Sequence, residues 1–287
     1  MAERSVFISK SIYPYFEEIR VSIDWFGGFA LSQKRKCQIG LHQNFLVNYP
    51  ERKVLEISSS SLVSLGAKLS AMNLSKKTRS GITTVESAFQ SSRVYRDGYD
   101  VIGPFPQYLF MEGRKCKKMV KEASKGMISK EYTFDGMTFY APEHHISLFY
   151  DFLYLNALLE PENEEVRKKL LSEEYDSFSD LATKSLNCQA RAAAIFVGLI
   201  KANKIDEVRE FSTYLKLFRT QEDGRAIGVE SYENVQLLQK NGVVLFSPVV
   251  PCVYHKAEVQ QYYKENCFGL NNRKDEDNYI DLRCQSS

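Results

Sequence analysis

The sequence contains few of the residues on which common catalytic centres depend. It has four histidines, and its six cysteines form neither a CxxC pair nor a Cys/His cluster with the spacing of zinc ligands. It also lacks a P-loop, a GxGxxG fingerprint and a GxSxG nucleophile elbow. These absences exclude structural zinc and the best-known nucleotide-binding and serine-hydrolase motifs, and they favour reduced thiols.

Long apolar runs and a strong net charge are also missing. No stretch approaches the roughly 20 apolar residues of a membrane span, and the first residues, Met-Ala-Glu-Arg-Ser, do not begin a secretory signal. We therefore expect a cytosolic protein, or a nuclear one in a eukaryotic host. Lys and Arg total 38 against 36 Asp and Glu, so any contact with nucleic acid has to come from a local patch.

One such patch lies between residues 114 and 130. Its seven basic residues are interrupted by a single acid, Glu122: Arg114, Lys115, Lys117, Lys118, Lys121, Lys125 and Lys130. A helix here would be strongly positive. It is either a solvated helix face or a surface for the phosphate backbone of a nucleic acid.

The order of apolar residues predicts an α+β fold, a mainly helical single domain with small antiparallel sheets. Strands are expected over 5–8, 19–26 and 54–57, and a hairpin around an Asp-Gly turn over 132–140. Helices are expected from Thr83 or Thr84 onward and over 146–159, 164–171, 186–200 and 208–219, with a strand over 243–251. The helix over 146–159 is apolar almost all round, so the charge of Asp151 within it requires a partner.

This pattern divides the chain into four parts. Residues 1–65 form a strand-rich beginning of the domain and residues 66–204 its core. Residues 205–270 form an extension of helix and strand, and residues 271–287 are predicted to be a mobile tail.

Two blocks place polar side chains on helices that are otherwise apolar. In the first, Glu86, Gln90 and Arg93 are spaced i, i+4 and i+7 and so share one helix face. The face is either an exposed ladder of charges or the floor of a polar pocket.

In the second block, Asn187 and Arg191 are spaced i, i+4 after a loop that carries Asp176 and Asp180. An amide and a guanidinium near a helix N-terminus can hold phosphate or ribose hydroxyls. The alternative is a helix cap together with a structural ion pair from Arg191 to a buried acid such as Asp151.

Three segments resemble motifs of the NADAR (NAD and ADP-ribose) superfamily, in the subgroup of antitoxins paired with toxins that ADP-ribosylate guanine in DNA. They are Leu69-Ser-Ala-Met-Asn-Leu74, Glu86-Ser-Ala-Phe-Gln-Ser-Ser-Arg93 and Ser185-Leu-Asn-Cys-Gln-Ala-Arg191. The sequence departs from the wider family at three positions. Arg93 stands where the family has Lys, and Ala190 replaces a Gly. The tryptophan that usually follows a later Tyr-Asp motif, here Tyr175-Asp176, is absent.

The resemblance implies hydrolysis of the N-glycosidic bond between ADP-ribose and guanine in DNA, without metal or cofactor. Its expected partners are ADP-ribosylated DNA, the product ADP-ribose and a cognate toxin. The catalytic residues would be Glu86 and Asp176. The residues implied in ADP-ribose binding are Ser70, Asn73, Gln90, Arg93, Asp180 (also a reserve for Asp176), Asn187 and Arg191. The residues expected to contact DNA are Arg114, Lys115, Lys117, Lys118 and Lys121.

Two alternatives keep part of this interpretation. One is an N-glycosidase for a small phosphorylated ribosylamine, which needs no DNA. The other is a protein without catalysis that binds ADP-ribose or neutralises the toxin by direct contact. In that last case, replacing Glu86 would leave protection intact.

Overall fold

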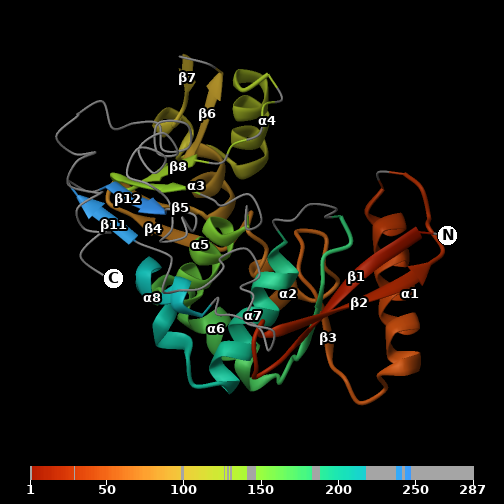
Figure 1. The fold of residues 1–287 in the computed structure, drawn as a ribbon. Coiled ribbons are helices and arrows are strands. Elements are labelled where there is room, and N and C mark those ends of the chain that lie inside the picture. Colours follow the sequence, from red (N-terminus) through yellow and green to blue (C-terminus); the bar gives the residue numbers. More distant parts are fainter. Residues whose placement is uncertain are drawn as a thin grey trace, which may run out of the picture.

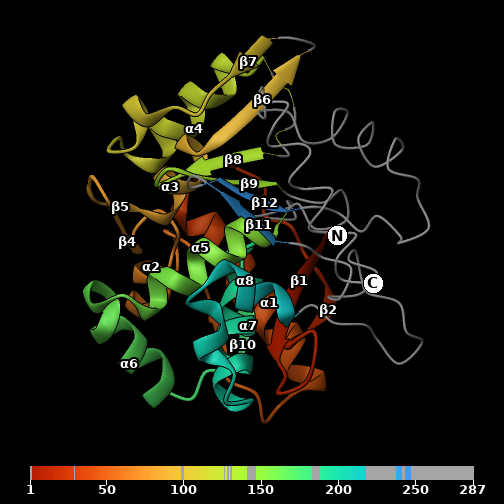
Figure 2. The same cartoon turned by 60° about the vertical axis from the view of Figure 1, so that its left-hand side comes forward.

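The computed structural model describes residues 2–28, 30–97, 100–125, 127, 129, 131–140, 147–182, 188–217, 237–240 and 243–246. Within them, two four-stranded sheets lie at different ends of the molecule, and α5 (Leu148–Leu159) and α7 (Gln189–Lys201) lie between them (Figures 1 and 2). The arrangement is the α+β single domain that the sequence predicts. None of the described helices combines the length and the apolar character needed to cross a bilayer.

The first sheet has the strand order β2-β1-β10-β3. Its bounds are β1 Ala2–Ser9, β2 Phe16–Ile23, β10 Ser177–Ser179 and β3 Val54–Glu56. β1 runs antiparallel to β2 and β10, whereas β10 runs parallel to β3. Successive side chains of a strand point to opposite faces. Accordingly, Val6 and Ile8 pack against α1 (Leu31–Asn48), and Phe7 packs into the core that contains α7.

Helix α1 is absent from the sequence predictions, and β2 ends three residues before the predicted strand does. The reason is the narrow apolar stripe of this helix, in which Cys37, Leu41 and Phe45 follow one another at i, i+4 and i+8. Polar and basic residues surround the stripe, and no side chain caps its N-terminus. A helix of this kind depends on the sheet beneath it rather than on its own pattern.

The second sheet has the order β7-β6-β8-β9. Its bounds are β6 Arg93–Asp97, β7 Asp100–Ile102, β8 Glu131–Phe134 and β9 Met137–Tyr140. The predicted hairpin is confirmed, because β8 and β9 pair across Asp135 and Gly136, whose φ angles of 50° and 77° are those of a tight hairpin turn. The basic helix α4 (Gly113–Ala123) and η1 (Pro106–Tyr108) adjoin this sheet, and Cys116 and Val120 of α4 pack with Tyr95.

Smaller elements join the sheets to the helices. They are α2 Ser64–Lys68, the hairpin of β4 Ser75–Thr78 and β5 Gly81–Thr84, α3 Val85–Ser91, η2 Pro161–Asn163, α6 Glu164–Ser172, η3 Ile205–Val208, α8 Phe211–Lys216 and the hairpin of β11 Leu237–Lys240 and β12 Val243–Phe246. The predicted helix over 164–171 is thereby confirmed, and the one predicted over 186–200 is confirmed as α7 from Gln189 onward. The predicted strand over 243–251 is present as β12 in its described part. The expected tail lies outside the described residues.

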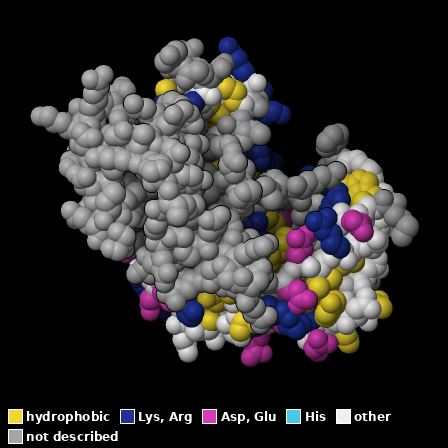
Figure 3. Space-filling view, in the orientation of Figure 1, with side chains coloured by type: hydrophobic (Ala, Val, Ile, Leu, Met, Phe, Trp, Pro, Cys, Tyr) yellow, Lys and Arg dark blue, Asp and Glu magenta, His cyan; other side chains and the backbone are white. Residues whose placement is uncertain are grey.

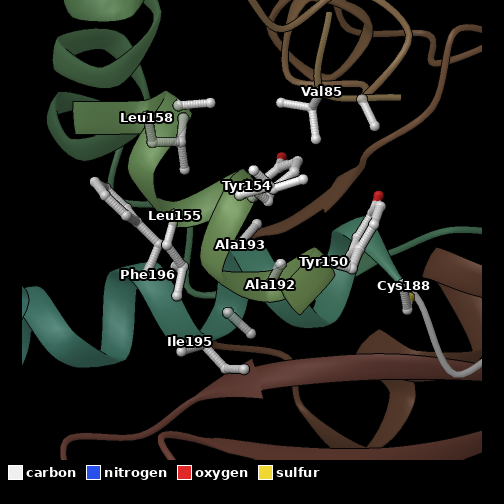
Figure 4. Close-up of a cluster of buried hydrophobic side chains, with 14 of the residues drawn as sticks. Val85, Tyr150, Tyr154, Leu155, Leu158, Cys188, Ala192, Ala193, Ile195 and Phe196 are labelled. Atoms are coloured by element: carbon white, nitrogen blue, oxygen red, sulfur yellow. The ribbon is translucent and has the colours of Figure 1, made fainter. Parts of the chain in front are cut away.

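The centre of the molecule is the contact between α5 and α7. Figure 4 shows Leu155 and Leu158 of α5 beside Phe196 of α7, where small alanines let the two helices approach. Nearly every residue of α5 is buried, as predicted. Val85 of α3 belongs to the same cluster, so the start of α3 is anchored in the core.

Candidate functional site

A pocket of about 680 Å³ lies where α1, α3 and α4 meet the ends of β3 and β10. Its lining comes from segments far apart in the sequence: Leu31, Lys34, Ser58, Ser59, Ser60, Ser70, Met72, Glu86, Phe89, Gln90, Arg93, Arg114, Lys117, Tyr150, Asp180, Ala182 and Gln189. Four of these side chains are basic and two are acidic. A cavity of this size and polarity suits an anionic ligand rich in hydroxyl groups.

Helix α3 supplies the first part of the pocket. The Thr84 side chain caps the helix by accepting a hydrogen bond from Ser87 N. Glu86 and Gln90 are buried, at 7% and 4% exposed, so the interpretation of this face as an exposed ladder is wrong. Gln90 Nε2 donates to Glu86 Oε1 over 3.0 Å, which orients the carboxylate.

Arg93 joins this group although it does not belong to the helix. α3 ends at Ser91 and Arg93 begins β6, so the predicted i+7 helical position is wrong. Its Nη1 nevertheless donates to Gln90 Oε1 over 3.3 Å, and its guanidinium lies 5.7 Å from the Phe89 ring centre and 5.2 Å from that of Tyr95. Within the described part of the chain, Arg93 Nε is buried without a hydrogen-bond partner. Arg93 therefore brings a fixed positive charge to the pocket wall.

The N-terminus of α4 closes over Glu86. A Cβ atom on Gly113 would lie 2.9 Å from Met72 Sδ and 3.1 Å from Glu86 Cγ, so a larger residue here would force these two side chains to shift. One turn later, Lys117 Nζ lies 3.6 Å from Glu86 Oε1, and Arg114 Nη2 donates to Ser59 Oγ over 2.9 Å. The close packing of α4 thus places Lys117 beside the carboxylate and Arg114 on the pocket wall.

Asp180 enters from the opposite wall, directly after β10. Gln189 Nε2, at the start of α7, donates to Asp180 Oδ2 over 2.9 Å and to the Ile57 carbonyl over 2.7 Å. Gln189 Oε1 accepts from Ala71 N over 2.8 Å. Gln189 therefore ties three pocket segments together.

Glu56, at the end of β3, lies fully buried behind Asp180. It accepts hydrogen bonds from Ser179 Oγ (2.5 Å) and Leu181 N (3.1 Å). Burial raises the pKa of Glu56 to about 7, and the neighbouring charge of Asp180 acts in the same direction. His42 Nε2 lies 2.9 Å from the same Ser179 hydroxyl, and burial lowers the pKa of His42 to about 4. A neutral imidazole, a hydroxyl and a carboxyl thus form a buried chain behind the pocket.

Sequence analysis missed Glu56, Gln189, Tyr150 and the serines at 58–60. A carboxylate in the short, apolar segment Val54–Ile57 and the run of four serines from Ser58 were the available signals. Neither signal identifies a pocket, because the segments after β3 and β10 come together only when these two strands pair in the folded protein.

Several predicted site residues do not line the pocket. Asp176 lies at the other end of β10, where its Oδ2 is 2.5 Å from Arg52 Nη1. Arg191 is paired with Asp151 at 2.9 Å, which confirms the structural alternative for this arginine. Asn73 is exposed, and its Nδ2 donates to the Ala67 carbonyl. Asn187 lies outside the described residues.

The predicted DNA contacts divide in the same way. Arg114 and Lys117 line the pocket. Lys115, Lys118 and Lys121 lie on other parts of the exposed surface of α4. Figure 3 shows Lys and Arg side chains gathered in the region of α4 at the top of the view. The helix therefore presents positive charge both into the pocket and around its rim.

The described residues contain no group of three or more His, Cys, Asp and Glu side chains arranged to hold a metal ion. The chemical groups that the pocket does offer are two carboxylates, two amides, several hydroxyls and four cations. Such a set can bind phosphate and ribose oxygens and can place a carboxylate beside a carbon that becomes positively charged.

Comparison with known proteins gives one family. The model of a family described as "DarT1-associated NADAR antitoxin" matches residues 2–226. The match includes both sheets, every segment that lines the pocket and the basic helix α4. A search of curated proteins finds no match.

Proposed function

Because the chain belongs to the family of DarT1-associated NADAR antitoxins, we propose that it is a DNA ADP-ribosyl glycohydrolase. It removes ADP-ribose from modified guanine by hydrolysing the N-glycosidic bond, and so reverses the modification made by a cognate ADP-ribosyltransferase toxin. The observation that supports this proposal most directly is the buried Glu86 carboxylate, which lies in a pocket otherwise rich in cations and hydrogen-bond donors.

The reaction requires a carboxylate for a physical reason. As the bond from the anomeric carbon to the base nitrogen breaks, its electron pair leaves with the base and positive charge develops on the ribose. Glu86 stabilises that charge, and its orientation is maintained by Gln90. Water then adds to the anomeric carbon, one of its protons is removed, and a proton reaches the departing base.

Asp180 takes the second role, for which the resemblance implied Asp176 with Asp180 as its reserve. Asp180 lines the pocket and is oriented by Gln189, whereas Asp176 is paired with Arg52 outside the pocket lining. In this proposal, Asp180 orients the attacking water or the ribose hydroxyls and accepts the proton.

The diphosphate of ADP-ribose is held by the cations of the pocket. Arg93 and Arg114 can each make bidentate contacts to phosphate oxygens, and Lys34 and Lys117 add positive charge. Ser70, Gln90 and the serines at 58–60 are available to ribose hydroxyls and to the base edge. Arg191 is not part of this scheme, because its guanidinium is already paired with Asp151.

The test is release of ADP-ribose from an oligonucleotide that carries one ADP-ribosylated guanine. We expect the native protein to release it and Glu86→Gln to lose at least about a hundredfold in rate, which corresponds to about 2.7 kcal/mol of barrier. Glu164→Gln is the matched control, because Glu164 lies on the exposed helix α6 in an i, i+4 pair with Lys168. Thermal unfolding of all three proteins checks that they are folded.

Other outcomes decide between this proposal and its alternatives. Folded native protein that releases nothing from the oligonucleotide contradicts the proposal, and release only from small phosphorylated ribosylamines would assign the pocket to that substrate class. If Glu86→Gln still protects cells that express the toxin, then the protein acts by binding rather than by hydrolysis.

A further inference from the structure

An exposed surface beside the pocket combines aromatic and basic side chains. Residues 24–36 contain Trp25 and Phe26, three basic residues and one acid, Asp24. Trp25 is 45% exposed and Phe26 is 47% exposed, although large aromatic side chains usually bury most of their area. Lys34 and Lys36, near the start of α1, are exposed as well, and Lys36 lies over the Phe26 ring. We call Trp25, Phe26, Lys34 and Lys36 the α1 platform.

The aromatic rings of the platform are positioned by specific contacts. Arg4 lies over the Trp25 ring at 4.3 Å from its centre, and Lys36 Nζ lies 5.9 Å from the centre of Phe26. Phe26 N lies 3.2 Å from Cys37 Sγ, which ties the loop to α1. Arg4 covers one face of the indole, and the large exposed fraction of the side chain shows that much of the ring remains open to solvent.

The platform is connected to the pocket by two routes. Leu31 and Lys34, in the first turn of α1, themselves line the pocket. In addition, Arg4 Nε donates to the carbonyl of Leu181 over 3.0 Å, and both neighbours of Leu181, Asp180 and Ala182, line the pocket. Trp25 is therefore two contacts from the pocket wall that carries Asp180.

The platform lies on a different side of the pocket from the basic helix. In Figure 1, α4 is at the top of the molecule and α1 is at the right, and Arg114 and Lys117 of α4 line the same pocket as Leu31 and Lys34 of α1. On the right of Figure 3, Lys and Arg side chains lie next to hydrophobic ones over the region of the N-terminal sheet and α1. Positive charge thus borders the pocket on both sides.

We infer that the α1 platform binds the unpaired bases and phosphates of a single-stranded nucleic acid next to the nucleotide held in the pocket. Aromatic faces stack on bases of any sequence, and nearby cations contact the phosphates. In a duplex the bases are already stacked on one another, so open aromatic rings favour a single strand. The strand would pass from α4 across the pocket mouth to Trp25 and Phe26. This inference rests on the proposed function, which it extends from the modified guanine to its neighbours.

Trp25 is the single tryptophan of the chain, so its fluorescence reports directly on the platform. The probe is an unmodified single strand of about 12 nucleotides, compared with its blunt duplex. We expect saturable quenching by the single strand and much weaker quenching by the duplex. Quenching by the duplex alone, or by neither, would overturn the inference.

Substitutions then separate stacking from charge. By anisotropy of a labelled single strand, Trp25→Ala and Phe26→Ala should each weaken binding about tenfold. Val47→Ala, at the 77% exposed far end of α1, should change nothing. Lys36→Gln should lower the slope of log affinity against log salt by about 0.7, whereas Lys168→Gln on α6 should not. Equal effects of the platform variants and the controls would contradict the inference.

A final comparison keeps this inference distinct from the proposed function. Trp25→Ala should lower kcat/KM for the ADP-ribosylated oligonucleotide about tenfold and leave ADP-ribose release from the modified mononucleotide unchanged. Strand binding without any release would leave the platform valid and refute the glycohydrolase. If the protein releases ADP-ribose from the oligonucleotide at a rate that does not depend on Trp25 or Phe26, the glycohydrolase stands and the α1 platform is refuted. Quenching by the toxin protein but not by the single strand would assign the surface to a protein partner and overturn the inference.

Discussion

Helix α3 carries Glu86 and Gln90 and helix α7 carries Arg191, but the protein uses these polar residues differently. On α3, Glu86 and Gln90 face the pocket and hydrogen-bond to each other. On α7, Arg191 faces the core and pairs with Asp151 of α5. Both carboxylates are almost completely buried, at 7% and 3% exposed. Burial of a charged residue therefore does not by itself indicate a functional site. Whether the residue is structural or functional depends on the group with which it is paired.

The partners of the Asp151 and Glu86 carboxylates differ in how much hydrogen-bonding capacity they leave for a ligand. Asp151 receives two hydrogen bonds from one guanidinium nitrogen, at 2.9 and 3.1 Å, so much of its bonding capacity is used. Burial raises the pKa of Asp151, and the charge of Arg191 opposes that effect. Glu86 has an amide at 3.0 Å and a half-exposed Lys117 at 3.6 Å, which a ligand can displace. One arrangement stabilises the core, and the other is suited to bind and react.

The largest expected effect tests the pair in the core. Arg191→Met should lower the free energy of unfolding by about 3–5 kcal/mol, because it leaves the Asp151 carboxylate buried without its cation. Urea unfolding measures this loss. The double variant Arg191→Met with Asp151→Leu should recover most of the stability, and Glu86→Gln should cost less than about 1 kcal/mol. If the Arg191→Met protein is as stable as the native one but no longer binds ADP-ribose, then Arg191 is a binding residue and the distinction between α3 and α7 is wrong.

A second test compares the two aspartates on either side of β10. Asp180→Asn should slow ADP-ribose release roughly tenfold to hundredfold, or about 1.4–2.7 kcal/mol of barrier. Asp176→Asn should leave the rate within about twofold, because the contacts of Asp176 with Arg52, Lys53 and Ser177 lie outside the pocket lining. Single-turnover kinetics on the modified oligonucleotide measures both. If Asp176→Asn were the slower variant, the assignment made from the pocket lining would be wrong.

A third test concerns Glu56, a buried acid whose hydrogen-bond donors are hydroxyls and a backbone N–H rather than a guanidinium. Its pKa is about 7 in the folded protein against 4.5 normally, so the folded state binds the proton more tightly. The contribution of Glu56 to the free energy of unfolding is therefore fully present below about pH 4.5 and is lost as the pH rises through about 7. The total loss is on the order of 3 kcal/mol at most.

The measurement is urea unfolding of native protein and Glu56→Gln from pH 5 to 8. His42 contributes a slope of the opposite sign below pH 6.5, because burial lowers its pKa to about 4. The difference between native protein and variant isolates Glu56, and we expect native protein to lose stability relative to the variant as pH rises. Parallel curves would show that Glu56 titrates normally.

The sequence predicted the structure correctly where local chemistry specifies it. The Asp135-Gly136 turn identified its hairpin, the Thr84 cap marked the start of α3, and the apolar run over 146–159 identified the central helix. It failed for α1, whose apolar stripe is too narrow to be recognised without the sheet beneath it. Four predicted binding residues, Ser70, Gln90, Arg93 and Asp180, line the pocket, whereas Asn73 and Arg191 do not.

The sequence by itself determined the fold class, the family resemblance and the presence of Glu86 and Gln90 on one short helix, because turns, caps and helical spacing act between neighbours in the chain. Only the tertiary structure decided which charged residues meet. The parallel pairing of β3 with β10 places Glu56 behind Asp180, and the packing of α7 under α5 directs Arg191 to Asp151. The first contact joins residues more than a hundred positions apart in the chain, and the second joins residues 40 positions apart. No local pattern in the sequence predicts contacts between residues so far apart.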